Sequence, residues 1–143
     1  MILAEAAVKS REEGSPIYLI ETIPYAQMLG LEPHFEGEEL LYRLPPKKGN
    51  VGNPTLPALH GGALGGFMEM SATLHLLMNM SVLKLPRVVD FSIDYIRAGL
   101  MKDTFVSCAL IREGRKLANV HIEAWQDDRQ VPIARARANF LVD

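Results

Sequence analysis

The chain has little of what several protein classes depend on. It contains one cysteine, so no disulfide can form within it. That residue, Cys108, stands in the strand-like segment 104–110 with no activating base beside it in the sequence, so we expect a packed thiol rather than a nucleophile. The 15 Lys and Arg residues are outnumbered by 17 Asp and Glu, which leaves a net charge of −2. Because nucleic-acid-binding proteins carry a basic surplus, no nucleic-acid partner is expected.

Several motifs that mark particular chemistries are also missing. No glycine-rich nucleotide-binding pattern follows a predicted strand, and no Gly-x-Ser-x-Gly elbow is present. His121 and Glu123 fall on one face of a predicted strand, but no third ligand stands at metal-like spacing, so no metal site is expected. His75, on an apolar segment, is expected to be a hydrogen-bonded core residue.

Signals for export or membrane insertion are weak. The segment 1–14 is interrupted by Glu5 before an apolar core of signal-peptide length develops, and it is typical of a short amphipathic helix. Segment 61–80 approaches transmembrane length, but it contains Glu69 and four glycines. We therefore expect a soluble, cytoplasmic protein with no membrane partner.

What the chain does have is a cluster of glycines at the start of that apolar segment. Gly61, Gly62, Gly65 and Gly66 lie within six positions. Each glycine inside a helix costs about 1 kcal/mol relative to alanine, so the cluster indicates that another backbone or a ligand comes very close. Apolar residues then occur on every side up to position 80, which is typical of a buried helix, and Glu69 interrupts them.

The rest of the pattern predicts an α+β protein. A second helix is expected over 22–31, with Thr22 as its cap and Pro24 in its first turn. A Pro- and Gly-rich loop is expected over 45–59. Strands separated by short turns indicate antiparallel pairing, and they are expected over 38–44, 88–96, 104–112, 116–126 and 131–142. The expected order is strand, buried helix and four-stranded meander, in one domain over 1–143 with residues 1–20 as an amino-terminal extension.

These features together resemble the hotdog fold, and more narrowly the acyl-CoA thioesterases of the phenylacetic-acid-degradation type. The similarity rests on Leu-His-Gly-Gly at 59–62 with Glu69 nine positions after the histidine, and on the segments 89–98, 112–118 and 133–137. The resemblance implies an antiparallel sheet wrapped around a long central helix. It also implies hydrolysis of an acyl-CoA to a free acid and coenzyme A, without a separate cofactor because coenzyme A is part of the substrate.

The chemistry of such a site can be outlined from the residues. If Gly61 and Gly62 begin the helix, their N–H groups can stabilise the oxyanion formed at a thioester carbonyl. Glu69 can serve as the nucleophile or as the base that activates water. It lies eight residues further on, about 12 Å along the axis, which is too far to serve the same carbonyl. A two-fold homodimer, alone or in a dimer of dimers, brings the partner's Glu69 to the site. The family resemblance implies the same arrangement.

Other candidate residues surround the glycines. His60 can orient the loop, contact substrate or satisfy backbone groups at the helix end. Asn53 resembles the family's loop asparagine, although it stands seven rather than six positions before His60, where Pro54 occurs; Asn50 is a second possibility, and a turn-forming role is open for both. Val88 stands where related enzymes often have a Ser or Thr that holds the attacking water.

Substrate contacts are expected mainly from basic residues. Arg112, Arg115 and Lys116 surround Gly114 at a predicted hairpin turn and are candidates to bind coenzyme A phosphates. Arg137 shares a strand face with Arg135 and is a candidate for the nucleotide. Tyr95 resembles a residue near the family's coenzyme A channel. For each basic group, a purely solvated surface role is the alternative.

Two other functions remain open at this point. The first is a non-catalytic acyl-CoA-binding hotdog protein, suggested by Val88 and by the shifted Asn53. The second is a dehydratase of 3-hydroxyacyl thioesters, which also pairs a histidine with a helix carboxylate across a dimer, although the spacing from His60 to Glu69 fits it poorly.

Overall fold

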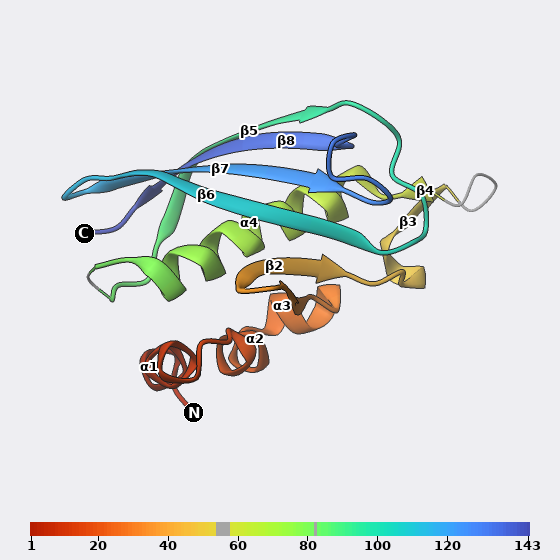
Figure 1. Ribbon diagram of the computed structural model, residues 1–143. Helices are drawn as coiled ribbons and strands as arrows, with labels where there is room; N and C mark the ends of the chain where they lie inside the picture. The colour runs from red at the N-terminus through yellow and green to blue at the C-terminus, as the bar shows by residue number, and fades with distance from the viewer. Residues whose placement is uncertain (54–57, 82) are drawn as a thin grey trace.

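A computed structural model describes residues 1–53, 58–81 and 83–143 (Figure 1). Its helices are α1 (Leu3–Glu13), α2 (Ile17–Thr22), α3 (Pro24–Leu29) and α4 (Gly61–Asn79), with a 3-10 turn, η1, at Lys48–Asn50. Its strands are β1 (Glu32–Glu36), β2 (Glu39–Leu44), β3 (Val51–Asn53), β4 (Ala58–Leu59), β5 (Arg87–Tyr95), β6 (Thr104–Glu113), β7 (Leu117–Trp125) and β8 (Ala134–Leu141).

Six strands form an antiparallel sheet in the order β1-β2-β6-β7-β8-β5, which curves around α4 (Figure 1). The alternation of β8 shows why one face is covered: Ala134, Ala136 and Ala138 are buried, while Arg135 and Arg137 between them are exposed. The apolar face packs on the helix and the polar face meets solvent, as is common for antiparallel sheets. The α+β hotdog architecture expected from the sequence is confirmed.

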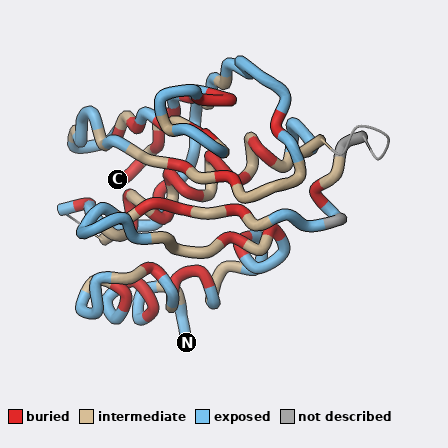
Figure 2. Tube along the Cα trace, turned by 45° about the vertical axis from the view of Figure 1, so that its right-hand side comes forward, coloured by how far each residue is buried: buried red, intermediate tan, exposed pale blue. Residues whose placement is uncertain are grey.

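Helix α4 is buried on most of its circumference, as its composition predicts. Its fully buried side chains include Phe67, Met68 and Leu76, which point in different directions around the axis. Buried stretches gather in the interior of the molecule in Figure 2, and α4 contacts β6, β7 and β8 as well as α1 and α3. One side of the helix therefore packs on the sheet, and much of the other side is covered by α1 and α3.

The amino-terminal helices are packed onto α4. Ala6 and Ala7 of α1 belong to the same apolar cluster as α4, and Arg11 Nε donates a 2.6 Å hydrogen bond to the carbonyl oxygen of Leu77. The predicted cap at Thr22 is wrong: Thr22 ends α2, and its hydroxyl donates to the carbonyl oxygen of Tyr18. Helix α3 begins instead at Pro24, whose fixed φ suits a first helical position.

Two further expectations need correction. The predicted four-stranded meander is wrong because β5 pairs with β8 and not with β6, so it lies at the sheet edge. The region before β2 contains the additional strand β1, which pairs with β2 in a hairpin, and the predicted loop 45–59 contains the short β3–β4 pair. Among the described residues, no helix is long and apolar enough to cross a membrane.

Candidate active site

The site is built around the first residues of α4. His60 precedes the helix with an extended backbone (φ −62°, ψ 129°), and its Nδ1 accepts a 2.9 Å hydrogen bond from the N–H of Gly62. This is the geometry of an N-cap, in which a side chain satisfies one of the unpaired amides of the first turn. His60 thus has a structural role at the helix start, and the Gly62 amide is already occupied.

A second contact holds the peptide group that joins Gly61 to Gly62, this time through its carbonyl oxygen. The hydroxyl of Tyr95, at the end of β5, donates a 2.7 Å hydrogen bond to the carbonyl oxygen of Gly61. The peptide that joins Gly61 to Gly62 therefore has its C=O bound by Tyr95 and its N–H bound by His60.

These contacts leave the amide of Gly61 available. The N–H of His60 donates to the carbonyl oxygen of Asn50 at 2.6 Å, and that of Leu64 donates to His60. Within residues 1–53, 58–81 and 83–143, no acceptor contacts the N–H of Gly61 or of Ala63. Gly61 has no side chain to shield its amide, so it is the better placed of the two to bind an oxyanion. Of the two amides expected from the sequence, Gly61 is the one with an unfilled donor.

Helix α4 has one comparatively open face. At about 100° per residue, Gly62, Gly66, Glu69 and Thr73 fall within about 60° of one another around the axis. Gly62 is exposed and the other three are half-buried, whereas most positions elsewhere on the helix are buried. Glu69 therefore projects on the side of α4 that neither the sheet nor the amino-terminal helices fully cover.

Two tyrosines border this open face and explain the glycine cluster. A Cβ at Gly61 would lie 3.6 Å from the Tyr95 ring, and one at Gly65 would lie 3.4 Å from its hydroxyl oxygen. On the other side, a Cβ at Gly66 would lie only 2.0 Å from the hydroxyl oxygen of Tyr25, which comes from α3. The close neighbours of these three glycines are therefore phenol groups, and a Cβ at Gly62 would meet the imidazole of His60 at 2.9 Å, where the sequence led us to expect a backbone or a ligand.

Thr73 is a candidate site residue that the sequence reasoning missed. It lies four positions after Glu69, so the two side chains are neighbours on the open face. Its hydroxyl donates a 3.1 Å hydrogen bond to the Glu69 carbonyl oxygen, which leaves the oxygen lone pairs able to accept from water. The sequence signal for Thr73 was its spacing, because a hydroxyl residue four positions after an acid lies on the same face of a helix. Val88, at the position where related enzymes often have a Ser or Thr, lies on β5 with 40% of its surface exposed.

The loop asparagines differ in how they are placed. Asn53 ends β3, where it pairs with Ala58, and its side chain lies outside the described part of the structure. Asn50 is buried, and its Nδ2 donates a 3.3 Å hydrogen bond to the carbonyl oxygen of Leu29 in α3. The side chain of Asn50 therefore ties the loop to α3, while its backbone carbonyl holds His60.

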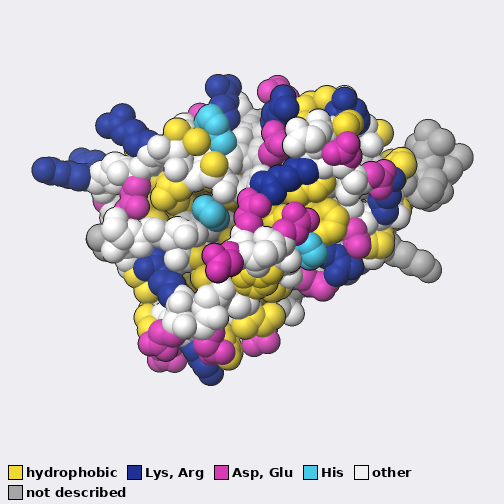
Figure 3. Space-filling view, viewed as in Figure 1, with side chains coloured by type: hydrophobic (Ala, Val, Ile, Leu, Met, Phe, Trp, Pro, Cys, Tyr) yellow, Lys and Arg dark blue, Asp and Glu magenta, His cyan; other side chains and the backbone are white. Residues whose placement is uncertain are grey.

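The basic hairpin lies far from Gly61 within one protomer. Arg112, Arg115 and Lys116 are exposed around the β6–β7 turn. Glu113 in the same turn accepts hydrogen bonds from the backbone N–H and the hydroxyl of Ser81, just after α4 ends. Lys and Arg side chains project from this end of the molecule in Figure 3, at the left in the view of Figure 1. Because the 19 residues of α4 span about 28 Å, this turn and Gly61 occupy opposite ends of the helix.

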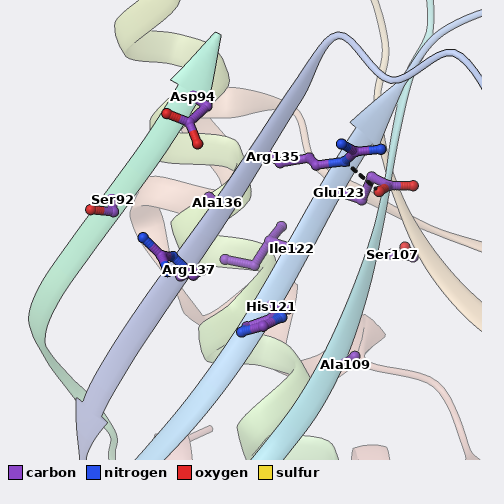
Figure 4. Close-up of a pocket in the computed structure, with 10 residues that line it drawn as sticks. All are labelled: Ser92, Asp94, Ser107, Ala109, His121, Ile122, Glu123, Arg135, Ala136 and Arg137. Carbon is purple, nitrogen blue, oxygen red and sulfur yellow. Dashed lines mark hydrogen bonds and ion pairs between the residues drawn. The ribbon is translucent and has the colours of Figure 1, made fainter. Parts of the chain in front are cut away.

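Arg137 lies on the outer face of the sheet, away from α4. It lines a hollow of about 390 Å³ (Figure 4). In the strand register Arg137 stands between Ser92 of β5 and His121 of β7. Its neighbour Arg135 is paired with Glu123, with 3.0 Å between Nε and the carboxylate oxygen. Within one protomer the sheet therefore separates Arg137 from the Gly61 amide.

The interior holds three titratable groups that play no part in this site. Burial lowers the pKa of His75, whose Nδ1 has no hydrogen-bond partner in the described structure, so the expectation of a hydrogen-bonded core histidine is wrong. Burial raises the pKa of the Cys108 thiol and that of the Tyr42 hydroxyl. Cys108 thus remains a thiol, as expected of a packed residue. The described residues include no group of three or more His, Cys, Asp or Glu side chains able to hold a metal ion.

Comparison with known proteins identifies the family. Residues 52–141, more than half of the chain, match the family model described as the acyl-CoA thioesterase N-terminal domain. The chain belongs to this acyl-CoA thioesterase family. It is therefore a thioester hydrolase, and the matched segment of the thioesterase runs from β3 to the end of β8.

Relatives of the thioesterase cover nearly its whole length. The medium/long-chain acyl-CoA thioesterase YigI of Escherichia coli K12 is 27% identical over 158 aligned positions, which cover 99% of this chain and 97% of YigI. The crystal structure of a Chromobacterium violaceum protein is 37% identical with a TM-score of 0.78, and 97% of each chain is covered. The PaaI protein of the E. coli phenylacetic acid degradation operon is 15% identical with a TM-score of 0.72, covering 96% of this chain and 98% of PaaI, so it supports the fold alone.

Proposed function

We propose that this thioesterase hydrolyses acyl-CoA at sites shared by two protomers, with the Gly61 amide from one and the Glu69 carboxylate from the other. One observation carries the proposal: the unfilled amide and the carboxylate belong to the same straight helix, eight residues and about 12 Å apart. No rotamer of Glu69 brings its carboxylate to a carbonyl bound at Gly61 of the same chain. A second copy related by a two-fold axis removes this separation.

Strand β5 offers the surface for that second copy. It pairs with β8 on one side, and no described strand covers its other edge. Val88 and Val89 are 40% and 57% exposed along it. A long uncovered edge with exposed apolar side chains is a template for pairing with another chain. When β5 pairs with its copy about a two-fold axis, the second α4 runs antiparallel to the first. The open faces of the two helices then face each other.

The reaction then follows from the residues present at each shared site. The carboxylate of the partner subunit's Glu69 takes a proton from water while the water oxygen bonds to the thioester carbon. The carbonyl electron pair moves onto its oxygen, and the N–H of Gly61 stabilises that charge. The carbonyl re-forms, the carbon–sulfur bond breaks, and the proton passes from Glu69 to the departing sulfur. We favour this route over direct attack by Glu69 because Thr73 lies one turn after Glu69 on the same face of α4, where its hydroxyl can hold the water.

The same arrangement suggests how the substrate lies. With the helices antiparallel, Ser81 of the partner lies about 18 Å beyond the partner's Glu69, measured along the helix. The partner's basic hairpin, which Glu113 ties to Ser81, then stands within reach of coenzyme A phosphates at the end of an extended pantetheine arm. We propose that the substrate carries a medium- or long-chain acyl group, in line with the name of YigI. A cytoplasmic location remains a prediction.

Two variants test the shared site. Glu69→Gln removes the base. Gly61→Pro removes only the N–H, because proline is favoured at the first helical position and the extended backbone of His60 suits a residue before proline. Each homodimer is expected to lose at least about 100-fold in kcat. Gly61→Ala is the matched control, since it keeps the N–H and its Cβ meets Tyr95 at an ordinary 3.6 Å.

The decisive measurement uses the mixed dimer. The Glu69→Gln and Gly61→Pro chains are co-expressed with different tags, and the dimer that carries both tags is purified. One of its two sites then has an intact Gly61 and an intact Glu69, so about half of the wild-type turnover is expected. An inactive mixed dimer, or an active wild-type monomer in analytical ultracentrifugation, would sink the shared-site proposal. Absence of acyl-CoA turnover by the wild type would sink the activity itself.

A further inference from the structure

The side chain of Tyr25, on α3, approaches the open face of α4 from the side of the amino-terminal helices. Its hydroxyl oxygen lies 2.0 Å from the place where a Cβ of residue 66 would be, and the neighbouring ring carbon lies 3.1 Å from it. The side chain is 38% exposed, and its hydroxyl has no hydrogen-bond partner among the described residues. A phenol group that lies against bare glycine without a polar partner is not explained by core packing.

The location of this hydroxyl relates it to Glu69. Side chains on a helix lean towards its amino end, so that of Glu69 covers the turn that contains Gly66. Cβ atoms three positions apart on one helix are about 5–6 Å from each other. Because the Tyr25 hydroxyl nearly occupies the Cβ position of residue 66, it stands at a similar distance from the Cβ of Glu69. The two further carbons and the carboxyl group of Glu69 can close that gap.

We infer that Tyr25 is a positioning residue for Glu69, and that its hydroxyl donates a hydrogen bond to the Glu69 carboxylate when that carboxylate acts on the thioester of the neighbouring protomer. This inference rests on the proposed function. The bond holds the Glu69 side chain in one rotamer, so that its carboxylate is ready to act on the water. Gly66 is then required because any side chain there would displace the phenol group.

Other titratable groups around α4 do not take this role. Arg11 of α1 is engaged by the Leu77 carbonyl, two turns further on, and Tyr95 of β5 is engaged by Gly61. His60 caps the helix through Nδ1. His75 of α4 itself and Cys108 of β6 lie in the interior. Helix α3 supplies no charged residue, so Tyr25 is its one titratable contribution.

Tyr25→Phe tests the inference, with Tyr18→Phe as the matched control. Tyr18 lies on neighbouring α2 with its ring under Lys9, away from α4. Tyr25→Phe is expected to lower kcat about tenfold with little change in KM. The acidic limb of the kcat/KM profile is expected to move to higher pH, because the variant lacks a hydrogen bond that favours the ionised form of the base. Tyr18→Phe should leave both unchanged.

The carbon-13 NMR shift of the Glu69 carboxyl provides a readout that needs no turnover. That shift is expected to differ between Tyr25→Phe and the wild type, because the carboxylate has lost a hydrogen bond, and to be unchanged in Tyr18→Phe. Equal carboxyl shifts and equal kcat in Tyr25→Phe and wild type would overturn the role of Tyr25 even if the thioesterase is active. A raised KM with normal kcat would also overturn it, because the phenol would then contact substrate and not Glu69.

Discussion

The hydroxyl of Tyr95 donates a 2.7 Å hydrogen bond to the carbonyl oxygen of Gly61, and so joins the end of the edge strand β5 to the first turn of the central helix. The peptide unit bound in this way is also held through its N–H by His60. Two side chains from different elements therefore fix the plane of one peptide at the helix start. The preceding peptide, which carries the Gly61 N–H, is thereby kept in place with its donor unfilled.

Tyr95→Phe is expected to lower kcat several-fold because the Gly61–Gly62 peptide loses one of its two holds. The free energy of unfolding should fall by about 0.5–1 kcal/mol, the low end for a hydrogen bond, since Tyr95 is 54% exposed. Urea denaturation and steady-state kinetics on a saturating acyl-CoA measure the two effects. The ring contact with Gly61 persists in the variant, so it serves as its own packing control. A kcat equal to that of the wild type would show that the bond is structural only.

Much of the fold was accessible from the sequence because the signals are local. The apolar run predicted a helix over 61–80 and the structure has 61–79, since burial on all sides needs no knowledge of the neighbours. The alternating strands β6, β7 and β8 were placed within about three residues of their bounds for the same reason. The position of β5 in the sheet was not accessible: alternation identifies a strand, but not a partner some 40 residues away.

The contacts around the glycine cluster could be predicted only in part. The glycine cluster correctly indicated a close approach, yet nothing in the cluster specifies what approaches. Tyr25 comes from α3, a helix of six residues that is too short to show a hydrophobic period. The capping of Gly62 by His60 depends on one side-chain rotamer, which a single sequence does not define. These contacts distinguish Gly61 from Gly62, two residues that look equivalent in the sequence.

Gly66→Ala is expected to destabilise the protein by about 1–2 kcal/mol, because its Cβ would lie 2.0 Å from the Tyr25 hydroxyl oxygen and this clash outweighs the gain of about 1 kcal/mol in helix propensity. Gly65→Ala is the matched control one position away. Its Cβ meets the nearest atom at 3.4 Å, so we expect it to be neutral or slightly stabilising.

Chemical denaturation of the single and double variants separates the clash from other effects. Phenylalanine at position 25 lacks the oxygen, so Gly66→Ala should cost much less in a Tyr25→Phe background than in the wild type. Additive losses in the double variant would mean that Gly66 is required by some neighbour other than Tyr25.

His75 is expected to make the protein less stable in mild acid. Burial lowers its pKa in the folded state below the ordinary value of about 6.5, so at lower pH the unfolded chain binds the proton more readily. Stability contributed by the neutral imidazole is therefore present above that pH and is lost as the pH falls below it. Urea unfolding between about pH 7.5 and 5.5 measures the decrease, and the protein concentration is held constant so that association does not contribute.

His75→Leu tests whether this acid sensitivity comes from His75, because the variant removes the titrating group and also the buried Nδ1 that has no partner. We expect the variant to be at least as stable as the wild type at pH 7.5, since an unsatisfied buried polar atom costs about 1–3 kcal/mol. Its stability should also fall less between pH 7.5 and 5.5. A wild type and a His75→Leu variant with the same pH dependence would place the acid sensitivity in other groups.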